Sequence, residues 1–129
     1  MSNFFDVALQ GFTTAGINMS SDVIKARFCR ASAYTFSAAH TSMTPVGAGV
    51  GTDPTLGSKS LVNGTFDAAD AVWSAVGAGA AIDQVIIYKF VTNDAGSTPI
   101  AFINGFSVTP NGGDITAVWQ STSPFIFLI

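Results

Sequence analysis

A mainly β protein with a single domain is predicted, built as an antiparallel β-sandwich or jelly-roll-like barrel of about seven to eight strands with a short N-terminal helix. All eight acidic residues are Asp and none is Glu, although Glu is common on exposed helix faces and Asp favours turns. After Asp22 short β-rich segments recur, with turn residues about every ten positions. The length of 129 residues fits one domain over 1–129.

The N-terminal segment, residues 1–20, is predicted to contain a helix or helical turn. Phe5, Ala8, Leu9 and Phe12 recur at helical spacing, and Ser2 or Asn3 could cap the helix. The helix would then cover one face of a sheet. An arm that docks on a partner protein is the alternative interpretation.

The first long strand is expected at Val23–Arg30. Its alternation places Ile24 and Phe28 on an apolar face, while the other face includes Lys25 and Arg27. The stretch "AYTFSAA" that follows could form a short second strand.

A long loop rich in glycine and proline is expected at Met43–Ser60, within "MTPVGAGVGTDPTLGSKS". Loops of this length in a small domain are usually functional or bound to a partner. Apolar side chains of this loop and of the two chain ends are therefore the candidate protein-interface residues. They are Phe4, Phe5, Val46, Val50, Leu56, Ile126 and Leu128.

Further strands are expected at regular intervals. Asn63-Gly64 predicts a two-residue hairpin turn, and "AVWSAVG" supplies the next strand. The run "VIIY" within Asp83–Val91 predicts a strand that is buried on both faces. Another strand is expected around Ile100–Ile103.

The end of the chain is predicted to form a turn and two strands. "TPNGGD" is the turn, and "DITAVW" alternates Ile115, Ala117 and Trp119 inward against Asp114, Thr116 and Val118 outward. The closing "FIFLI" has no polar position, so both faces of this last strand should be covered, one by the core and one by a neighbouring chain or the N-terminal segment.

The surface is expected to be poor in charge. Only 10% of residues are charged, and the net charge is −3. Such a surface favours association with other chains, and we expect a homo-oligomer. The basic residues form no stripe that could neutralise phosphates, so nucleic-acid binding is not expected. No secretory signal or membrane span is expected, because no apolar run approaches about 18 residues.

No catalytic, cofactor or metal site is predicted. His40 is the one histidine and lacks the surroundings of a Ser/His/Asp site, and Cys29 is expected to be a small buried residue. Asp67 and Asp70 in "FDAAD" could in principle act as paired carboxylates, but they are more typical of a turn between strands.

Several segments match a known family in order and spacing. They are Phe4–Phe12, Val23–Arg30, Ala38–Ser42, Asp67–Trp73, Val85–Lys89 and Thr109–Trp119. Together they resemble small virion structural proteins of tailed bacteriophages, of the capsid decoration or cement type. The most specific part is "VTPNGGDIT", Val108–Thr116. The chain departs from these proteins in its final strand, where Phe125 and Leu128 replace the usual basic residues, and in its glycine-rich loop.

The resemblance implies a non-enzymatic structural protein of the virion, made in the cytoplasm of the bacterial host. It would bind the major capsid protein or other virion proteins on the outer shell, with a trimer favoured. One alternative is a tail, baseplate or adaptor protein of the same particle. A carbohydrate-binding adhesion module is another, and would use Trp73, Tyr88 or Trp119 as exposed aromatic platforms.

Overall fold

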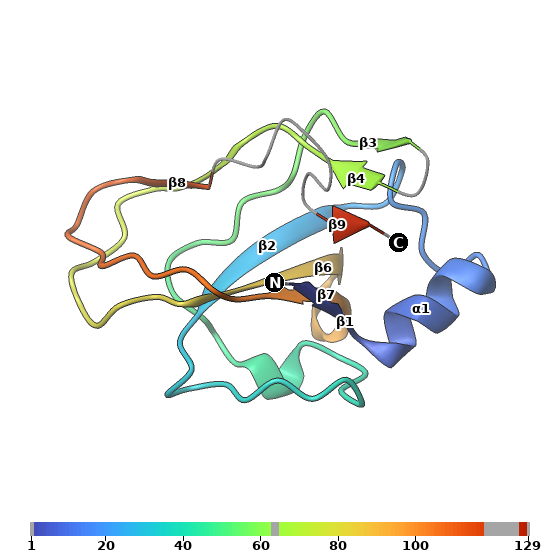
Figure 1. Ribbon diagram of the computed structural model, residues 1–129, viewed down its shortest axis with the longest axis horizontal. Coiled ribbons are helices and arrows are strands. Elements are labelled where there is room, and N and C mark those ends of the chain that lie inside the picture. The colour runs from blue at the N-terminus through green and yellow to red at the C-terminus, as the bar shows by residue number, and fades with distance from the viewer. Residues whose placement is uncertain (1, 63–64, 118–126, 129) are drawn as a thin grey trace.

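A four-stranded antiparallel sheet forms the centre of the molecule (Figure 1). The computed structural model describes residues 2–62, 65–117 and 127–128. The central strands lie in the order β1-β7-β6-β2. Their bounds are Ser2–Phe4 for β1, Ile24–Cys29 for β2, Gln84–Val91 for β6 and Asn93–Ile103 for β7. The predicted mainly β, antiparallel character of the chain is confirmed.

Two smaller antiparallel sheets accompany the central one. β3 (Ser60–Val62), β4 (Thr65–Asp67) and β9 (Phe127–Leu128) form one, and β5 (Ala71–Trp73) pairs with β8 (Ile115–Ala117) in the other. Figure 1 shows β3, β4 and β9 on one side of the central sheet and the segment after β2 on the opposite side. None of these three sheets closes into a barrel within the described residues.

The central sheet is covered on both faces, as the run "VIIY" predicts. Ile86 and Ile87 point to opposite faces of β6, and both are fully buried. On one face the ring of Trp73 from β5 stacks on Phe28, with 3.7 Å between ring centroids. On the other, Phe102 of β7 packs into a cluster of aromatic rings from the N-terminal segment and the segment after β2. The core is therefore one body with the central sheet between two layers.

The predicted N-terminal helix is present as α1 (Asp6–Thr13), but its expected cap is wrong. Phe5 occupies the N-cap position and provides no side-chain cap. Ser2 and Asn3 cannot cap the helix, because they pair in β1 with residues 102–103 of β7. The backbone N–H of Phe5 extends this pairing by donating to the carbonyl of Ile100 at 3.0 Å.

Two further expectations around β2 are corrected by the structure. The face predicted to be polar is largely covered, since Arg27 and Cys29 are both buried. The stretch "AYTFSAA", residues 33–39, forms turns and irregular backbone instead of a strand. Its aromatic residues pack inward from this irregular backbone: Tyr34 is buried, and Phe36 stacks on Phe102 with 4.7 Å between centroids.

The remaining predicted strands are present with altered bounds: β5 covers only the start of "AVWSAVG", and β7 begins well before the expected Ile100–Ile103. β3 and β4 pair with Val62 opposite Thr65, as a two-residue hairpin requires, while the turn at 63–64 lies outside the described residues. In β8, Ile115 and Ala117 are half-buried and Thr116 is exposed, so the predicted alternation is confirmed there. Trp119 and Val118 lie beyond the described part of this strand.

The long loop covers the outer edge of β2. The N–H of Val50 donates to the carbonyl of Phe28 at 2.8 Å, and the N–H of Leu56 donates to the carbonyl of Ile24 at 2.8 Å. Between them, the carbonyl of Pro54 accepts from the N–H of Ala26. An exposed strand edge invites pairing with other chains, and here the loop occupies it.

This close approach requires glycine at position 49. Gly49 has φ +69°, and a Cβ there would lie 2.5 Å from Cγ of Arg27 and 2.6 Å from the carbonyl oxygen of Phe28. Gly47 also has positive φ, +78°, but a Cβ there would meet nothing within 4 Å. Alanine substitution at Gly47 therefore tests backbone strain alone, whereas substitution at Gly49 adds a steric clash.

We expect Gly49→Ala to destabilise the fold by about 3 kcal/mol or more, and Gly47→Ala by only about 1 kcal/mol. Both variants place alanine in the left-handed region, but only the first drives a methyl group into β2. Urea denaturation of the two variants measures the difference. Equal losses would show that the loop does not lie tightly on the β2 edge.

Candidate functional site

The seven candidate interface residues differ in how far the chain itself buries them. Phe5, Val46 and Leu56 are buried in the core of the chain itself, so their side chains are accounted for by internal packing. Phe4 and Val50 are half-buried. Ile126 lies outside the described residues. Leu128 lies in β9, and its backbone pairs with Thr65 of β4. The side chain of Leu128 is likewise not among those described.

The strongest polar cluster is centred on Arg27, which is 7% exposed. Its Nε donates to Oδ2 of Asp53 at 2.8 Å, and Nη1 donates to the carbonyl of Gly47 at 2.7 Å. Both terminal nitrogens contact Asp94, at 3.1 and 2.9 Å. The hydroxyl of Tyr88 donates to the same oxygen of Asp53 at 2.5 Å. Two points of the long loop and the start of β7 are thereby joined to β2.

The protonation states of this cluster are fixed by its surroundings. Burial by itself lowers the pKa of Arg27, but hydrogen bonds to Asp94 and Asp53 outweigh it and raise the pKa well above its usual value. Burial and the neighbouring Asp53 also raise the pKa of Tyr88, which stays a neutral hydrogen-bond donor. Because each of these groups is held by partners within the chain, the cluster is suited to structural support rather than to proton transfer.

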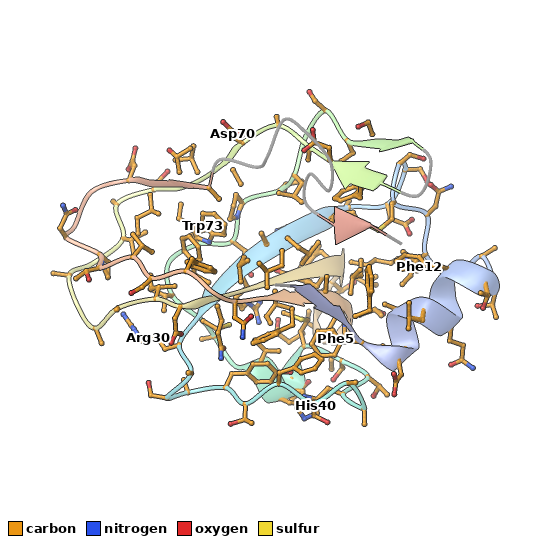
Figure 2. The ribbon with its side chains drawn as sticks, in the orientation of Figure 1. Phe5, Phe12, Arg30, His40, Asp70 and Trp73 are labelled. Atoms are coloured by element: carbon orange, nitrogen blue, oxygen red, sulfur yellow. The ribbon has the colours of Figure 1, made fainter. Side chains whose placement is uncertain are left out.

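His40 and Cys29 are also held in structural surroundings. Nδ1 of His40 lies 2.8 Å from the hydroxyl of Tyr34, and the two rings are in contact. Cys29 is buried, as predicted, and burial raises the pKa of its thiol to about 12. The prediction that Asp67 and Asp70 both lie in a turn is wrong for Asp67, which is the last residue of β4 and half-buried. Asp70 lies exposed between β4 and β5, and Figure 2 shows it at the outer edge of the molecule.

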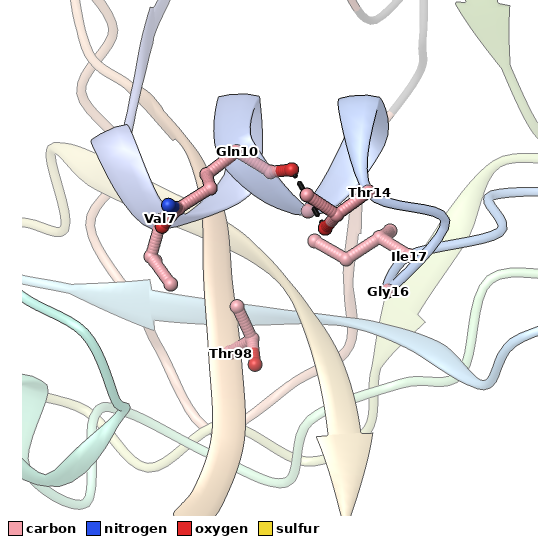
Figure 3. Close-up of a pocket in the computed structure, with 7 residues that line it drawn as sticks. Val7, Gln10, Thr14, Gly16, Ile17 and Thr98 are labelled. Carbon is pink, nitrogen blue, oxygen red and sulfur yellow. Dashed lines mark hydrogen bonds between the residues drawn. The ribbon is translucent and has the colours of Figure 1, made fainter.

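A groove of about 360 Å³ lies between α1, the turn after it and the central sheet. Figure 3 shows Val7, Gln10 and Thr14 of this N-terminal segment on one side and Thr98 of β7 on the other. Its remaining lining residues are Gly11, Gly16 and Ile17. Among the described residues the lining is free of ionisable side chains, and it offers packing and hydroxyl contacts.

Lysine side chains fix the connection between α1 and β2. Nζ of Lys89 donates to the carbonyl of Gly16 at 2.9 Å and lies 3.3 Å from Oδ2 of Asp22. Nζ of Lys59 donates to the carbonyl of Asp22. Although partial burial raises the pKa of Asp22, the backbone N–H of Asn18 and the ammonium of Lys89 outweigh it and lower the pKa overall.

Large apolar side chains are exposed at scattered positions. Leu9, Val23, Val72 and Val91 are each more than two-fifths exposed. Val23 and Val91 lie at one end of β2 and β6, near Phe90, whose ring is covered by Nζ of Lys25 at 4.1 Å. By contrast, the aromatic rings of Trp73 and Tyr88 are buried, so neither can act as an exposed platform for a sugar.

Within the described ranges, no helix is long and apolar enough to cross a membrane. Over the same residues, no group of three or more His, Cys or Asp side chains gathers into a set that could hold a metal ion.

Removing Asp53 should cost more stability than removing Asp94. Side-chain exposure is 11% for Asp53 and 40% for Asp94, although both pair with Arg27. We expect Asp53→Ala to lower the free energy of unfolding by about 2–4 kcal/mol, because a buried guanidinium and the Tyr88 hydroxyl lose their acceptor. Asp94→Ala should cost about 1 kcal/mol. Denaturant unfolding provides the measurement, and the reverse order would contradict this structure of the cluster.

The thiol of Cys29 should be unreactive in the folded protein. With a pKa of about 12, its thiolate fraction at pH 8 is far below that of an ordinary thiol. We expect labelling by a disulfide reagent at pH 8 to be slower by about 100-fold or more than in denaturant. Because the folded-state pKa is raised, the associated stability is present below about pH 8.5 and declines above it. Rapid labelling under native conditions would contradict this burial.

Comparison of the chain with protein-family models, curated proteins and solved structures found no match, so the geometry and the residues themselves are the basis for a functional assignment.

Proposed function

We propose that the chain is a non-enzymatic structural protein of a tailed-phage particle, and that it acts as a head decoration or cement protein on the outer capsid surface. The observation that carries this proposal is the resemblance in sequence over nearly the whole chain, strongest at Val108–Thr116. In this proposal the major capsid protein is the partner, and the protein is located in the virion. The finer architecture in this proposal is a β-sandwich or jelly roll.

Residues of the segment Val108–Thr116 form hydrogen bonds that hold the chain after β5. Gly112 adopts a positive φ of +92°. Its N–H donates to the carbonyl of Val76 at 2.7 Å, and the N–H of Val76 donates to the carbonyl of Gly113 at 3.0 Å. Oδ1 of Asp114 accepts from the N–H of Ala75 at 2.8 Å. The turn therefore clamps the chain that follows β5.

The composition of the surface also supports association with other chains. A net charge of −3 and few charged side chains oppose packing only weakly. Exposed Leu9, Val23, Val72 and Val91 offer apolar contacts at different points of the surface. A closed homo-oligomer, with a trimer favoured, would suit the threefold and quasi-threefold positions of an icosahedral shell.

A tail, baseplate or adaptor protein of the same particle is the alternative, and the number of copies distinguishes it from a decoration protein. The adhesion-module alternative is less favoured, because two of its three candidate aromatic rings, Trp73 and Tyr88, are buried.

Binding of the purified protein to phage shells that lack it tests the proposal directly. We expect co-sedimentation with the shells and hundreds of copies per particle, together with a higher temperature of shell disruption. A few to dozens of copies would point to the tail instead. Absence from purified particles, together with no binding to shells, would contradict a virion role.

A further inference from the structure

The middle of the long loop is held differently from its two ends. Val46 and Leu56 are buried in the core, at 4% and 2% exposure. Residues 47–55, which lie between them, are called the strap below. The structure describes every residue of the strap, and none of them is buried to the same degree. A segment without a buried side chain gains little from apolar packing, so its position depends on polar contacts.

The strap approaches the core through the backbone of glycine residues. A Cβ on Gly49 would collide with β2, and a Cβ on Gly51 would lie 3.3 Å from Cγ2 of Val76. Gly47, Gly49 and Gly51 all adopt positive φ angles, at +78°, +69° and +76°. Because glycine changes between positive and negative φ at little cost, the strap can bend at these three positions. An open cavity of about 290 Å³ borders residues 45–50, so this part of the chain has space beside it.

Two backbone hydrogen bonds join the strap to the edge of β2. The N–H of Val50 donates to the carbonyl of Phe28 at 2.8 Å, and the carbonyl of Pro54 accepts from the N–H of Ala26 at 3.2 Å. The pairing consists of isolated bridges and does not form a continuous ladder. If the strap moved away, these groups of β2 would be open to another extended backbone.

Asp53 binds the strap to the buried polar cluster. Its Oδ2 accepts from Nε of Arg27 at 2.8 Å and from the hydroxyl of Tyr88 at 2.5 Å. The carbonyl of Gly47, at the start of the strap, accepts from Nη1 of Arg27 at 2.7 Å. Asp94, the other carboxylate on this guanidinium, belongs to β7. Movement of the strap would therefore break the pair of Arg27 with Asp53 and leave the pair with Asp94 in place.

We propose that the strap opens as a unit while the central sheet stays folded, with its three left-handed glycines as hinges. The carboxylate of Asp53 holds the strap closed and keeps the open form rare. Local opening of this kind is characteristic of segments with few buried apolar contacts. In the open form the edge of β2 is uncovered at Ala26 and Phe28, so the strap controls access to a strand edge of the kind that pairs with other chains. This inference does not depend on the proposed function.

Native-state hydrogen exchange in low concentrations of urea tests the opening in the wild-type protein. The amides of Val50 and Ala26 lose their acceptors when the strap opens, whereas the amide of the buried Leu56 stays bound to the carbonyl of Ile24. We expect Val50 and Ala26 to exchange faster than Leu56 and with little dependence on urea, because local opening exposes little surface. If Val50 and Ala26 share the steep urea dependence of Leu56, the strap does not open by itself and the inference is overturned.

Asparagine variants test the assignment of Asp53. Asp53→Asn keeps the size of the side chain but removes its charge, and we expect it to accelerate exchange at Val50 and Ala26 about tenfold to a hundredfold. Asp94→Asn is the matched control, because the pair of Asp94 with Arg27 is present in both the closed and the open form. It should change exchange at these two amides by less than about threefold. Equal acceleration by both variants, or no acceleration by Asp53→Asn, would overturn the role of Asp53. The urea dependence of the wild type tests the opening independently of either variant.

Discussion

The buried guanidinium of Arg27 is the constraint around which the rest of the structure is arranged. A charge removed from water must recover its hydrogen bonds inside the protein, and few backbones offer enough acceptors on their own. Here the acceptors come from segments distant in sequence: Asp53 and the carbonyl of Gly47 from the long loop, and Asp94 from the start of β7. A loop that must deliver two acceptors to one side chain of β2 has little freedom to leave the edge of that strand. The loop that covers the edge of β2 is thus the same loop that supplies acceptors to the buried Arg27.

The turn between β6 and β7 is organised to deliver the third acceptor. Thr92 adopts a positive φ of +57°, which is uncommon for a β-branched residue, and the hydroxyl of Ser97 accepts from the N–H of Val91 and donates to the carbonyl of Asn93. These contacts fix the connection between β6 and β7, and with it the position of Asp94 at the start of β7. Strain at one residue is tolerated because several hydrogen bonds determine the conformation around it.

Periodicity and turn chemistry are the parts of this fold that can be read from the sequence. The strand at "VIIY", the hairpin around 63–64 and the alternation of Ile115 with Thr116 depend on neighbours in the chain, and each was predicted in place. The same local reasoning failed to predict the burial of Arg27. Its partners lie 26 and 67 residues away, and the sequence of the strand gives no indication of them. It failed again for residues 33–39, where aromatic rings enter the core from irregular backbone.

The candidate site was less predictable than the fold for a related reason. Apolar residues of a long loop are equally consistent with an external partner and with packing onto their own chain. The structure assigns Val46 and Leu56 to the chain itself, because hydrogen bonds hold the loop against β2. Arg30 was not singled out from the sequence, and its partner, the carbonyl of Ala80, is 50 residues away. The residues best suited to meet a partner are those whose internal contacts are incomplete, and only the folded chain reveals which these are.

Most Lys and Arg side chains are bound to partners within the chain, and this limits how they can contribute to binding another protein. Arg27 is enclosed, Lys59 and Lys89 bind backbone carbonyls of the connection before β2, and Lys25 lies over the ring of Phe90. Little positive charge is then left to steer an encounter over long distances, so complementary shape and apolar contact must supply most of the binding energy. Under the proposed function, association would then depend on slow dissociation and correct register more than on rapid electrostatic capture.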